Sequence, residues 1–226
     1  MLLAIDSSAG ASAALIDRGQ VVAAWSTPQT TSHAEVLAGA VRDVLAEVGA
    51  GSGAAAGAAL SGVVVGVGPG PFTGLRVGLA LAQSLVCAWD IPLHGVCSLD
   101  SIARRGLDSG AVEGDFVVAT DARRREVYWG VYSVDGRSPG PRVGPATEVP
   151  ALPVIGSGAG LYPDELRQGS VPDEALGWLP DAAELGVIAE DALRGESAGA
   201  ALLPPRPLYL RESDAKVPAR MRGAGA

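Results

Sequence analysis

The sequence has few of the residues that build disulfide frameworks, metal sites or membrane spans. Its 226 residues include two cysteines, Cys87 and Cys97, and two histidines, His33 and His94. None of the four stands at the spacing of a CxxC pair or a metal-ligand pair, so we interpret the cysteines as small buried hydrophobic residues and the histidines as structural or surface side chains. No apolar run reaches the ~18 uncharged residues of a membrane helix, and Asp6 interrupts the N-terminus before a signal-peptide core could form. We therefore expect a cytoplasmic protein without membrane association.

Lysine is nearly absent, and acidic residues outnumber basic ones. Lys216 is the only lysine beside sixteen arginines, and the formal net charge is −8. A charge of this sign repels a phosphate backbone at long range, which argues against autonomous nucleic-acid binding. Any nucleic acid should arrive through a partner. The one basic cluster, Arg123, Arg124 and Arg125, is interpreted as a solvated bend.

Length and patterning predict an α/β fold. The chain is long enough for one large domain or two small lobes, and its 48% of apolar residues indicates that most of it folds. Strand and helix periodicities follow one another along the first hundred residues. We predict strands at residues 2–6, 11–17, 20–26, 62–67 and 93–97, helices at 31–49, 73–89 and 98–107, a flexible low-complexity connection at 49–59 and a glycine-rich loop at 68–74.

The remainder of the chain predicts a second, smaller lobe. Two strands at 116–120 and 126–134 flank the charged bend at 121–125, a strand-to-loop junction follows at 154–158, and a late helix covers 182–193. The predicted division is a first lobe at residues 1–103, a smaller lobe at 104–211, and a tail at 212–226 that is expected to be disordered.

The sequence GPGPFTGLRVG at residues 68–78 lies between a buried strand and a helix. Such a turn aims backbone N–H groups and a helix dipole at an anion, so Gly68, Gly70, Thr73 and Gly74 are candidate cofactor-binding residues. Asp6, in AIDSS at the end of the first strand, is a fifth candidate, because an acidic residue there can hold a metal-bound nucleotide. Tight strand-to-helix packing demands the same glycines, and Asp6 can equally cap a turn. Both interpretations stay open.

No complete catalytic set is present. The loop lacks the lysine of a Walker motif, which excludes an ordinary P-loop NTPase. There is no GxSxG elbow, HExxH helix or paired-cysteine site. From the residues alone, we predict no catalytic residues.

Six segments spread over nearly the whole chain form a recognisable set: AIDSS at 4–8, SHAEVL at 32–37, GPGPFTGLRVG at 68–78, DARRREVYWGVY at 121–132, GSGA at 156–159 and PLYLR at 207–211. Together they resemble the bacterial TsaB (YeaZ) family. The resemblance implies an actin-like, Hsp70-like ATPase (ASKHA) fold of two related lobes, the second reduced. It also implies a role in forming threonylcarbamoyladenosine next to the anticodon of tRNAs that read codons beginning with adenine.

The TsaB family resembles a catalytic paralogue, TsaD, in which the stretch PLxGVNHLEGH supplies two metal-binding histidines four residues apart. The corresponding stretch of this chain places Ser98 and Ile102 at those two positions. An isoleucine cannot coordinate a metal, and serine alone is a poor ligand. His94 lies outside the pair. The resemblance therefore predicts no metal, no cofactor and no catalytic activity of the chain alone.

The resemblance also implies partners: a TsaD-like catalytic subunit, a TsaE-like ATPase, a homodimer in the absence of TsaD, and tRNA only through the complex. It assigns docking to the helices at 31–49 and 73–89. An exposed apolar patch without a partner would be a liability, so we expect apolar residues of these helices to form the interface. The candidates are Leu37, Val41, Val44, Leu75 and Leu79.

Two alternatives belong to other classes. The first is a small-molecule kinase or phosphotransferase of the same fold, with Asp6 and residues 68–74 handling ATP. The second is a peptidase, which lacks support because neither a Ser-His-Asp order nor a metal pair is present. Whether Arg123, Arg124 and Arg125 contact tRNA inside a complex is left open by the sequence.

Overall fold

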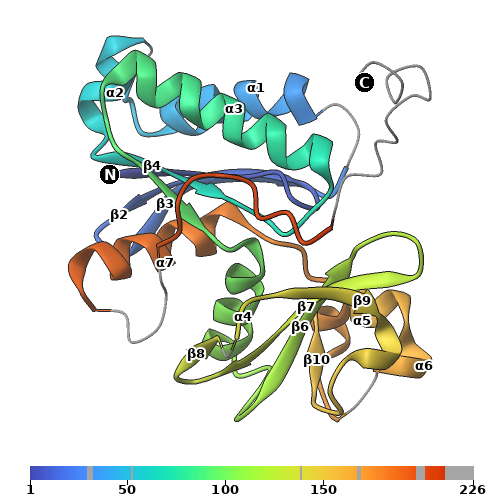
Figure 1. Cartoon of the computed structure of the whole chain (residues 1–226). Helices are drawn as coiled ribbons and strands as arrows, with labels where there is room; N and C mark the ends of the chain where they lie inside the picture. Colours follow the sequence, from blue (N-terminus) through green and yellow to red (C-terminus); the bar gives the residue numbers. More distant parts are fainter. Residues whose placement is uncertain (30–32, 52, 138, 167–168, 197–201, 212–226) are drawn as a thin grey trace, which may run out of the picture.

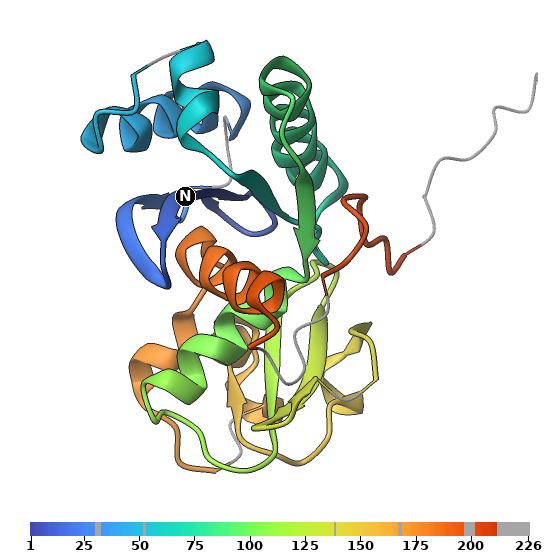
Figure 2. The ribbon, with the colours of Figure 1, turned by 90° about the vertical axis from the view of Figure 1, so that its left-hand side faces the viewer.

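A computed structural model describes the chain except for residues 30–32, 52, 138, 167–168, 197–201 and 212–226. Its first sheet has the order β3-β2-β1-β4-β5, in which β4 and β5 run parallel to β1 and the other pairs are antiparallel. Three helices cover one face of this sheet and α7 covers the other (Figures 1 and 2). The elements are β1 (Leu2–Asp6), β2 (Ala11–Asp17), β3 (Gln20–Thr27), α1 (His33–Glu47), α2 (Ala54–Ala59), β4 (Gly62–Gly66), α3 (Phe72–Trp89), β5 (Leu93–Val96) and α7 (Ala182–Arg194).

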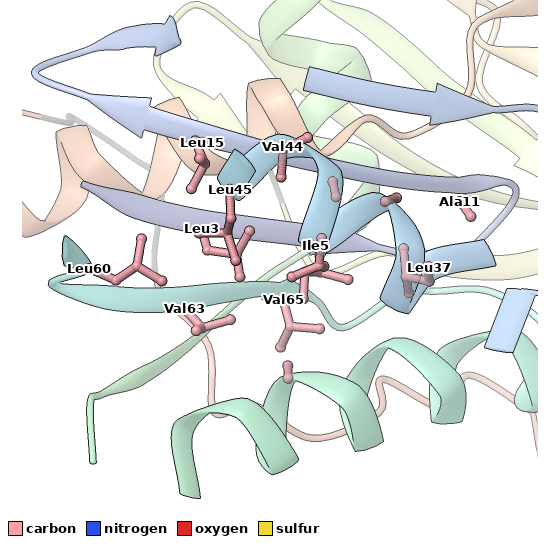
Figure 3. Close-up of a cluster of buried hydrophobic side chains, with 14 of the residues drawn as sticks. Leu3, Ile5, Ala11, Leu15, Leu37, Val44, Leu45, Leu60, Val63 and Val65 are labelled. Atoms are coloured by element: carbon pink, nitrogen blue, oxygen red, sulfur yellow. The ribbon is translucent and has the colours of Figure 1, made fainter. Parts of the chain in front are cut away.

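The central strands are buried on both faces, which explains their unbroken apolar sequences. Side chains alternate along a strand. Leu3 and Ile5 of β1 therefore pack under α1 together with Val63 and Val65 of β4 (Figure 3). Their neighbours on the opposite face, such as Val64, pack under α7. Two helical layers thus sandwich one sheet.

A second sheet, also of five strands, repeats part of this plan with shorter strands, two of which are only two residues long. Strands β6 and β7 form an antiparallel hairpin, β10 lies parallel to β6, and β8 and β9 both pair with β7. The hairpin and β10 correspond to β1, β2 and β4 of the first sheet, whereas no described strand corresponds to β5. The predicted actin-like fold with a reduced second lobe is confirmed. The elements are α4 (Ser98–Asp108), β6 (Phe116–Asp121), β7 (Glu126–Ser133), β8 (Gly136–Arg137), β9 (Arg142–Pro145), β10 (Val154–Ile155), α5 (Ser157–Leu161), α6 (Pro163–Leu166) and 3-10 turns at Ala146–Glu148 and Asp173–Gly177.

The predicted lobe boundary differs from the structure. Residues 103 and 104 lie inside α4, whose Leu99 and Ile102 pack in the core of the second sheet. Helix α7 packs on the first sheet again, because Leu185 and the apolar residues on the same side of the helix are buried against β1 and β2. The chain therefore crosses between the lobes more than once.

Three local predictions need correction. The connection at 49–59 contains the short helix α2, because a run of alanines favours helix even without large side chains. Cys87, predicted buried, is exposed on the outer face of α3, while Cys97 is buried as predicted. The strand β9 was missed, since its four residues carry no strand periodicity. The predicted disordered tail, 212–226, lies outside the described residues.

We predict that Gly186→Ala destabilises the protein although it adds a better helix former. A Cβ at Gly186 would lie directly on Ile16 and 3.1 Å from the Cβ of Ala4, in a fully buried interface. Overpacking of this kind costs about 1–3 kcal/mol, more than the ~1 kcal/mol that alanine gains over glycine in a helix. Urea unfolding measures the difference.

The matched control is Gly39→Ala in α1. A Cβ at this position meets nothing closer than an Arg42 nitrogen at 3.9 Å, so this substitution should stabilise the protein by about 0.5–1 kcal/mol. Equal gains for both variants would contradict the close packing of α7 on the sheet.

Candidate functional site

Asp6 ends β1 and is enclosed by two serines. Its side chain is 1% exposed. One carboxylate oxygen, Oδ1, accepts hydrogen bonds from the backbone N–H of Ser8 at 2.8 Å and from its hydroxyl at 2.7 Å, while Oδ2 accepts from the hydroxyl of Ser98 at 2.6 Å. Both oxygens therefore already have donors within the protein.

Burial dominates the electrostatics of Asp6. Removal from water raises the pKa of the carboxyl above its usual value of 3.8, and the negative charge of Asp181 adds to the rise. The hydrogen bonds from Ser98 and Ser8 act in the opposite direction. Burial and the serine hydrogen bonds therefore act in opposite directions on the pKa of Asp6, and burial has the larger effect.

The glycine-rich loop packs tightly on this network. Gly68 donates its N–H to the Ser98 hydroxyl at 3.1 Å and accepts the Ser98 N–H at 2.8 Å. A Cβ at Gly70 would lie 2.5 Å from the carbonyl oxygen of Ser8, and a Cβ at Gly66 would lie directly on Asp6. These glycines allow the loop to approach the end of β1.

Ser7 makes the corresponding contacts to α3. Its hydroxyl donates to the carbonyl of Gly74 at 2.7 Å and accepts the N–H of Gly78 at 3.0 Å. Two amides of the loop and helix, those of Gly68 and Gly78, therefore donate to serine hydroxyls. Thr73, also a candidate for anion binding, is exposed on the outer surface. Of the two interpretations left open by the sequence, this geometry favours close packing.

Ser98 and Ile102, the two positions compared above with the metal-binding histidines of TsaD, make structural contacts in this chain. Ser98 is fully buried between Asp6 and Gly68, and Ile102, 1% exposed, packs in the core of the second sheet. His94 lies half-buried on β5, where burial lowers its pKa. Within the described part of the chain, no three His, Cys, Asp or Glu side chains are grouped so that they could hold a metal ion.

The predicted interface residues need correction. Leu37, Val41, Val44, Leu75 and Leu79 are between 0 and 4% exposed and belong to the chain's own core. The helical repeat selects the stripe that faces the sheet, so the outward residues are their neighbours. Between α1 and α3 these neighbours line a groove of about 430 Å³, which we call the α1–α3 groove: Ala38, Thr73, Arg76, Val77, Ala80 and Leu81.

Helix α3 is unusually apolar for a surface helix. By length and composition alone it could span a membrane, which is weak evidence for a single helix, and 28% of it is buried in the protein. Its inner stripe, Leu75, Leu79 and Ala82, is buried under the helix, while its outer face is open. The helix therefore covers the sheet with its inner stripe and keeps Val77, Leu81, Leu85 and Val86 half-buried along its sides, while its fully exposed residues are mixed polar and small ones.

The bend at 123–125 is exposed as predicted, but its backbone is unusual. Arg123, Arg124 and Arg125 have φ values of 62°, 58° and 61°. Residues other than glycine adopt this left-handed backbone conformation at a cost of roughly 1–2 kcal/mol each. No sequence signal pointed to it, since arginine does not favour positive φ. We call these three residues the arginine turn.

Comparisons with known proteins agree with one another. A family model described as TsaD: tRNA N6-adenosine threonylcarbamoyltransferase matches residues 26–154, more than half of the chain. An uncharacterised protein of Mycobacterium tuberculosis is 42% identical over 151 residues, 65% of this chain and 62% of that protein. The tRNA threonylcarbamoyladenosine biosynthesis protein TsaB of Haemophilus influenzae is 35% identical over 129 residues, 57% of this chain and 52% of that protein. The match spans less than two thirds of the length of these curated relatives.

A solved structure matches almost end to end. A crystal structure from Pseudomonas aeruginosa, of an uncharacterised protein with similarity to peptidase YeaZ, has a TM-score of 0.76 and 30% identity, covering 93% of this chain and 99% of that one. Fold and site define the class as an actin-like α/β protein of two related lobes, with the aspartate of its first strand enclosed by serines. The chain belongs to the TsaD family, and its likeness to TsaB and YeaZ proteins confirms the predicted TsaB (YeaZ) assignment.

We predict that Asp6→Asn keeps the fold and Asp6→Ala weakens it. Asparagine can accept both bonds from Ser8 and donate to Ser98, so its free energy of unfolding at pH 7 should change by within about 1 kcal/mol. Alanine leaves the buried Ser8 and Ser98 donors without an acceptor, which costs about 3 kcal/mol. Urea unfolding distinguishes the two, and equal losses would contradict the described network.

The same pair of proteins tests the raised pKa of Asp6. A carboxyl whose pKa is higher in the folded state holds its proton more tightly when folded, so it favours folding at low pH. The unfolding free energy of the natural protein relative to Asp6→Asn should therefore fall as the pH rises above about 3.8. A relative stability that rises over that range would mean that the folded pKa is lowered.

Proposed function

We propose that this chain is a non-catalytic subunit that docks onto a TsaD-like catalytic subunit during the formation of threonylcarbamoyladenosine. The modified adenosine lies next to the anticodon of tRNAs that read codons beginning with adenine. Family membership and the name of the Haemophilus influenzae relative support the biosynthetic role.

One observation carries the non-catalytic assignment. The two positions that correspond to the histidine ligands of the catalytic paralogue are a serine bound to Asp6 and an isoleucine in the core. Neither side chain is free to take up a ligand without breaking the buried structure around it. The chain would therefore contribute through its surface rather than through bond-making chemistry.

The α1–α3 groove is the proposed docking surface for the TsaD-like subunit. Val77 and Leu81 are half-buried in it, and Ala38 and Ala80 are exposed along its edges. The half-buried Leu85 continues this row along α3. A helix of the partner, laid along α1 and α3, would cover this apolar surface, and in the absence of TsaD a second copy of the chain would do so.

The other partners follow from this arrangement. A TsaE-like ATPase would supply ATP hydrolysis, and tRNA would reach the chain only through the assembled complex, because the net charge of −8 opposes independent binding. No cofactor is required of this chain. Since the complex would act on tRNA, we expect the chain in the cytoplasm.

No specific observation favours the kinase or peptidase alternatives. A kinase would need Asp6 to face a metal-bound nucleotide, whereas both carboxylate oxygens accept hydrogen bonds from buried serines. Magnesium-dependent ATP hydrolysis by the isolated chain would establish the kinase alternative in place of the scaffold.

Reconstitution tests the proposed function. The chain is mixed with the TsaD-like and TsaE-like proteins of the same organism, threonylcarbamoyl-AMP, ATP and unmodified tRNA, and the modified adenosine is assayed with each protein omitted in turn. Modification that requires this chain, with none from the chain alone, is the expected result. Full-rate modification without it would refute the proposal.

A negative charge introduced by substitution into the α1–α3 groove should prevent docking of the TsaD-like subunit. We predict that Ala38→Glu and Ala80→Glu each abolish co-elution with the TsaD-like protein, because a carboxylate would be buried against an apolar partner surface. Both positions are exposed, so the circular dichroism spectrum and melting temperature should stay close to those of the natural protein.

The matched control is Leu193→Glu. Leu193 is also exposed and apolar, at 47%, but it lies on α7, on the opposite face of the first sheet (Figure 2). This variant should bind the partner normally. Retained binding by both groove variants would move the interface elsewhere.

A further inference from the structure

The arginine turn combines an unfavourable backbone with three cationic side chains. It connects β6 to β7, and its residues Arg123, Arg124 and Arg125 all have positive φ. In the described part of the chain, glycine takes a positive φ at eleven positions, and only two residues besides the arginine turn do so without being glycine, Arg18 and Asp90. At most of these positions, the described chain therefore uses glycine, the residue that adopts a positive φ freely. Backbone strain that a glycine would remove is typical of functional positions.

Hydrogen bonds and ion pairs at the base of the β6–β7 hairpin stabilise the conformation of the arginine turn. Asp121 accepts the N–H of Arg123 at 2.7 Å and pairs with its guanidinium at 3.2 Å. Glu126 pairs with Arg211, which also donates to the carbonyl of Ala122 at 3.0 Å. The two carboxylates of the hairpin are therefore engaged at its base. The side chain of Arg123 is nevertheless 66% exposed, and Arg125 is also exposed.

The arginine turn lies at the same end of the molecule as the start of α3. Arg211 belongs to a C-terminal segment, residues 202–211, that runs over the first lobe (Figure 1). In this segment, Tyr209 packs on Phe72 with ring centres 4.7 Å apart and accepts a hydrogen bond from Arg76 at 3.1 Å. Arg76 lines the α1–α3 groove. A continuous set of contacts thus joins the proposed docking surface to the arginine turn.

We propose that Arg123 and Arg125 bind phosphate groups of the RNA substrate in the assembled complex. This inference rests on the proposed function, which supplies the RNA. Guanidinium groups suit phosphate geometry, and exposed groups on a protruding turn suit an extended polyanion. The net charge of −8 prevents the chain from recruiting RNA alone, so the contact forms only once the partner has brought the RNA close.

Glycine substitution separates the charge from the fold. Arg125→Gly, and the double variant Arg123→Gly with Arg125→Gly, remove guanidinium groups from positions whose backbone suits glycine. The melting temperature should therefore stay equal or rise. The matched control is Arg18→Gly, which also removes an exposed arginine at positive φ, from the β2–β3 turn at the far end of the first sheet.

The measurement is the affinity of unmodified tRNA for the complex of this chain with the TsaD-like protein, by fluorescence anisotropy across a range of salt concentrations. The double variant should weaken binding about tenfold and make the salt dependence shallower by about 0.7 for each phosphate that the variant no longer binds, while the Arg18→Gly complex binds as the natural one does. Unchanged affinity and salt dependence in the double variant would overturn the proposal. So would a loss of partner co-elution without a loss of RNA affinity, because the arginine turn would then bind an acidic protein surface.

Failure of the proposed function can be told apart from failure of this inference. Co-elution of the natural chain with the TsaD-like protein tests the first. If no complex forms, the proposed function fails, and this inference, which rests on it, fails with it. If the complex forms and the double variant co-elutes normally but binds tRNA as tightly as the natural complex does, only the phosphate contact is refuted.

Discussion

The whole arrangement depends on a buried carboxyl, Asp6, that is held by hydrogen bonds from serines. Asp6 lies where the ends of β1 and β4 meet the start of α4, and its donors come from two distant segments, Ser8 and Ser98. A buried carboxyl without such donors would cost several kcal/mol, so the segments have to stay together. Gly66 and Gly70 make this possible, because any side chain there would collide with Asp6 or Ser8. The glycine motif is therefore explained by packing before any ligand is considered.

This network also sets how the two lobes meet. Ser98 is the first residue of α4, and the same helix inserts Leu99 and Ile102 into the core of the second sheet. Helix α7 then leads the chain back to the first sheet, and Leu203 pairs with Gly95 at the edge strand. The Ser98 hydroxyl, at a position that the resemblance aligns with a metal ligand of TsaD, thus joins Asp6 to the glycine-rich loop. Such an arrangement is consistent with a subunit that presents a rigid surface.

Much of the first lobe was predictable because its physics is local. Strands β1 to β4 are short apolar runs between turn residues, and α3 follows its glycine loop directly. The correspondence of Ser98 and Ile102 with the two metal ligands of TsaD came only from the resemblance and stays a prediction. The interface was not predictable, because helical periodicity identifies residues such as Leu37 and Leu75 that face the sheet, and says nothing of which outward residues line a groove. The positive φ of residues 123–125 was equally hidden, since hairpin geometry imposes it against the preference of arginine.

The arginine turn is a local cationic group on a chain whose net charge is negative. The chain repels polyanions as a whole, yet it concentrates arginines on one turn and neutralises the carboxylates beneath that turn with Arg123 and Arg211. Screening limits the long-range repulsion to about 8–10 Å at physiological salt, so a local cationic group acts on a phosphate only after something else has brought it within that distance. A partner docked on the α1–α3 groove would do so, because residues 202–211 contact both the groove residue Arg76 and the base of the arginine turn. In the proposed complex, the acidic surface would prevent binding of RNA by the free subunit, and the arginine turn would act only after assembly.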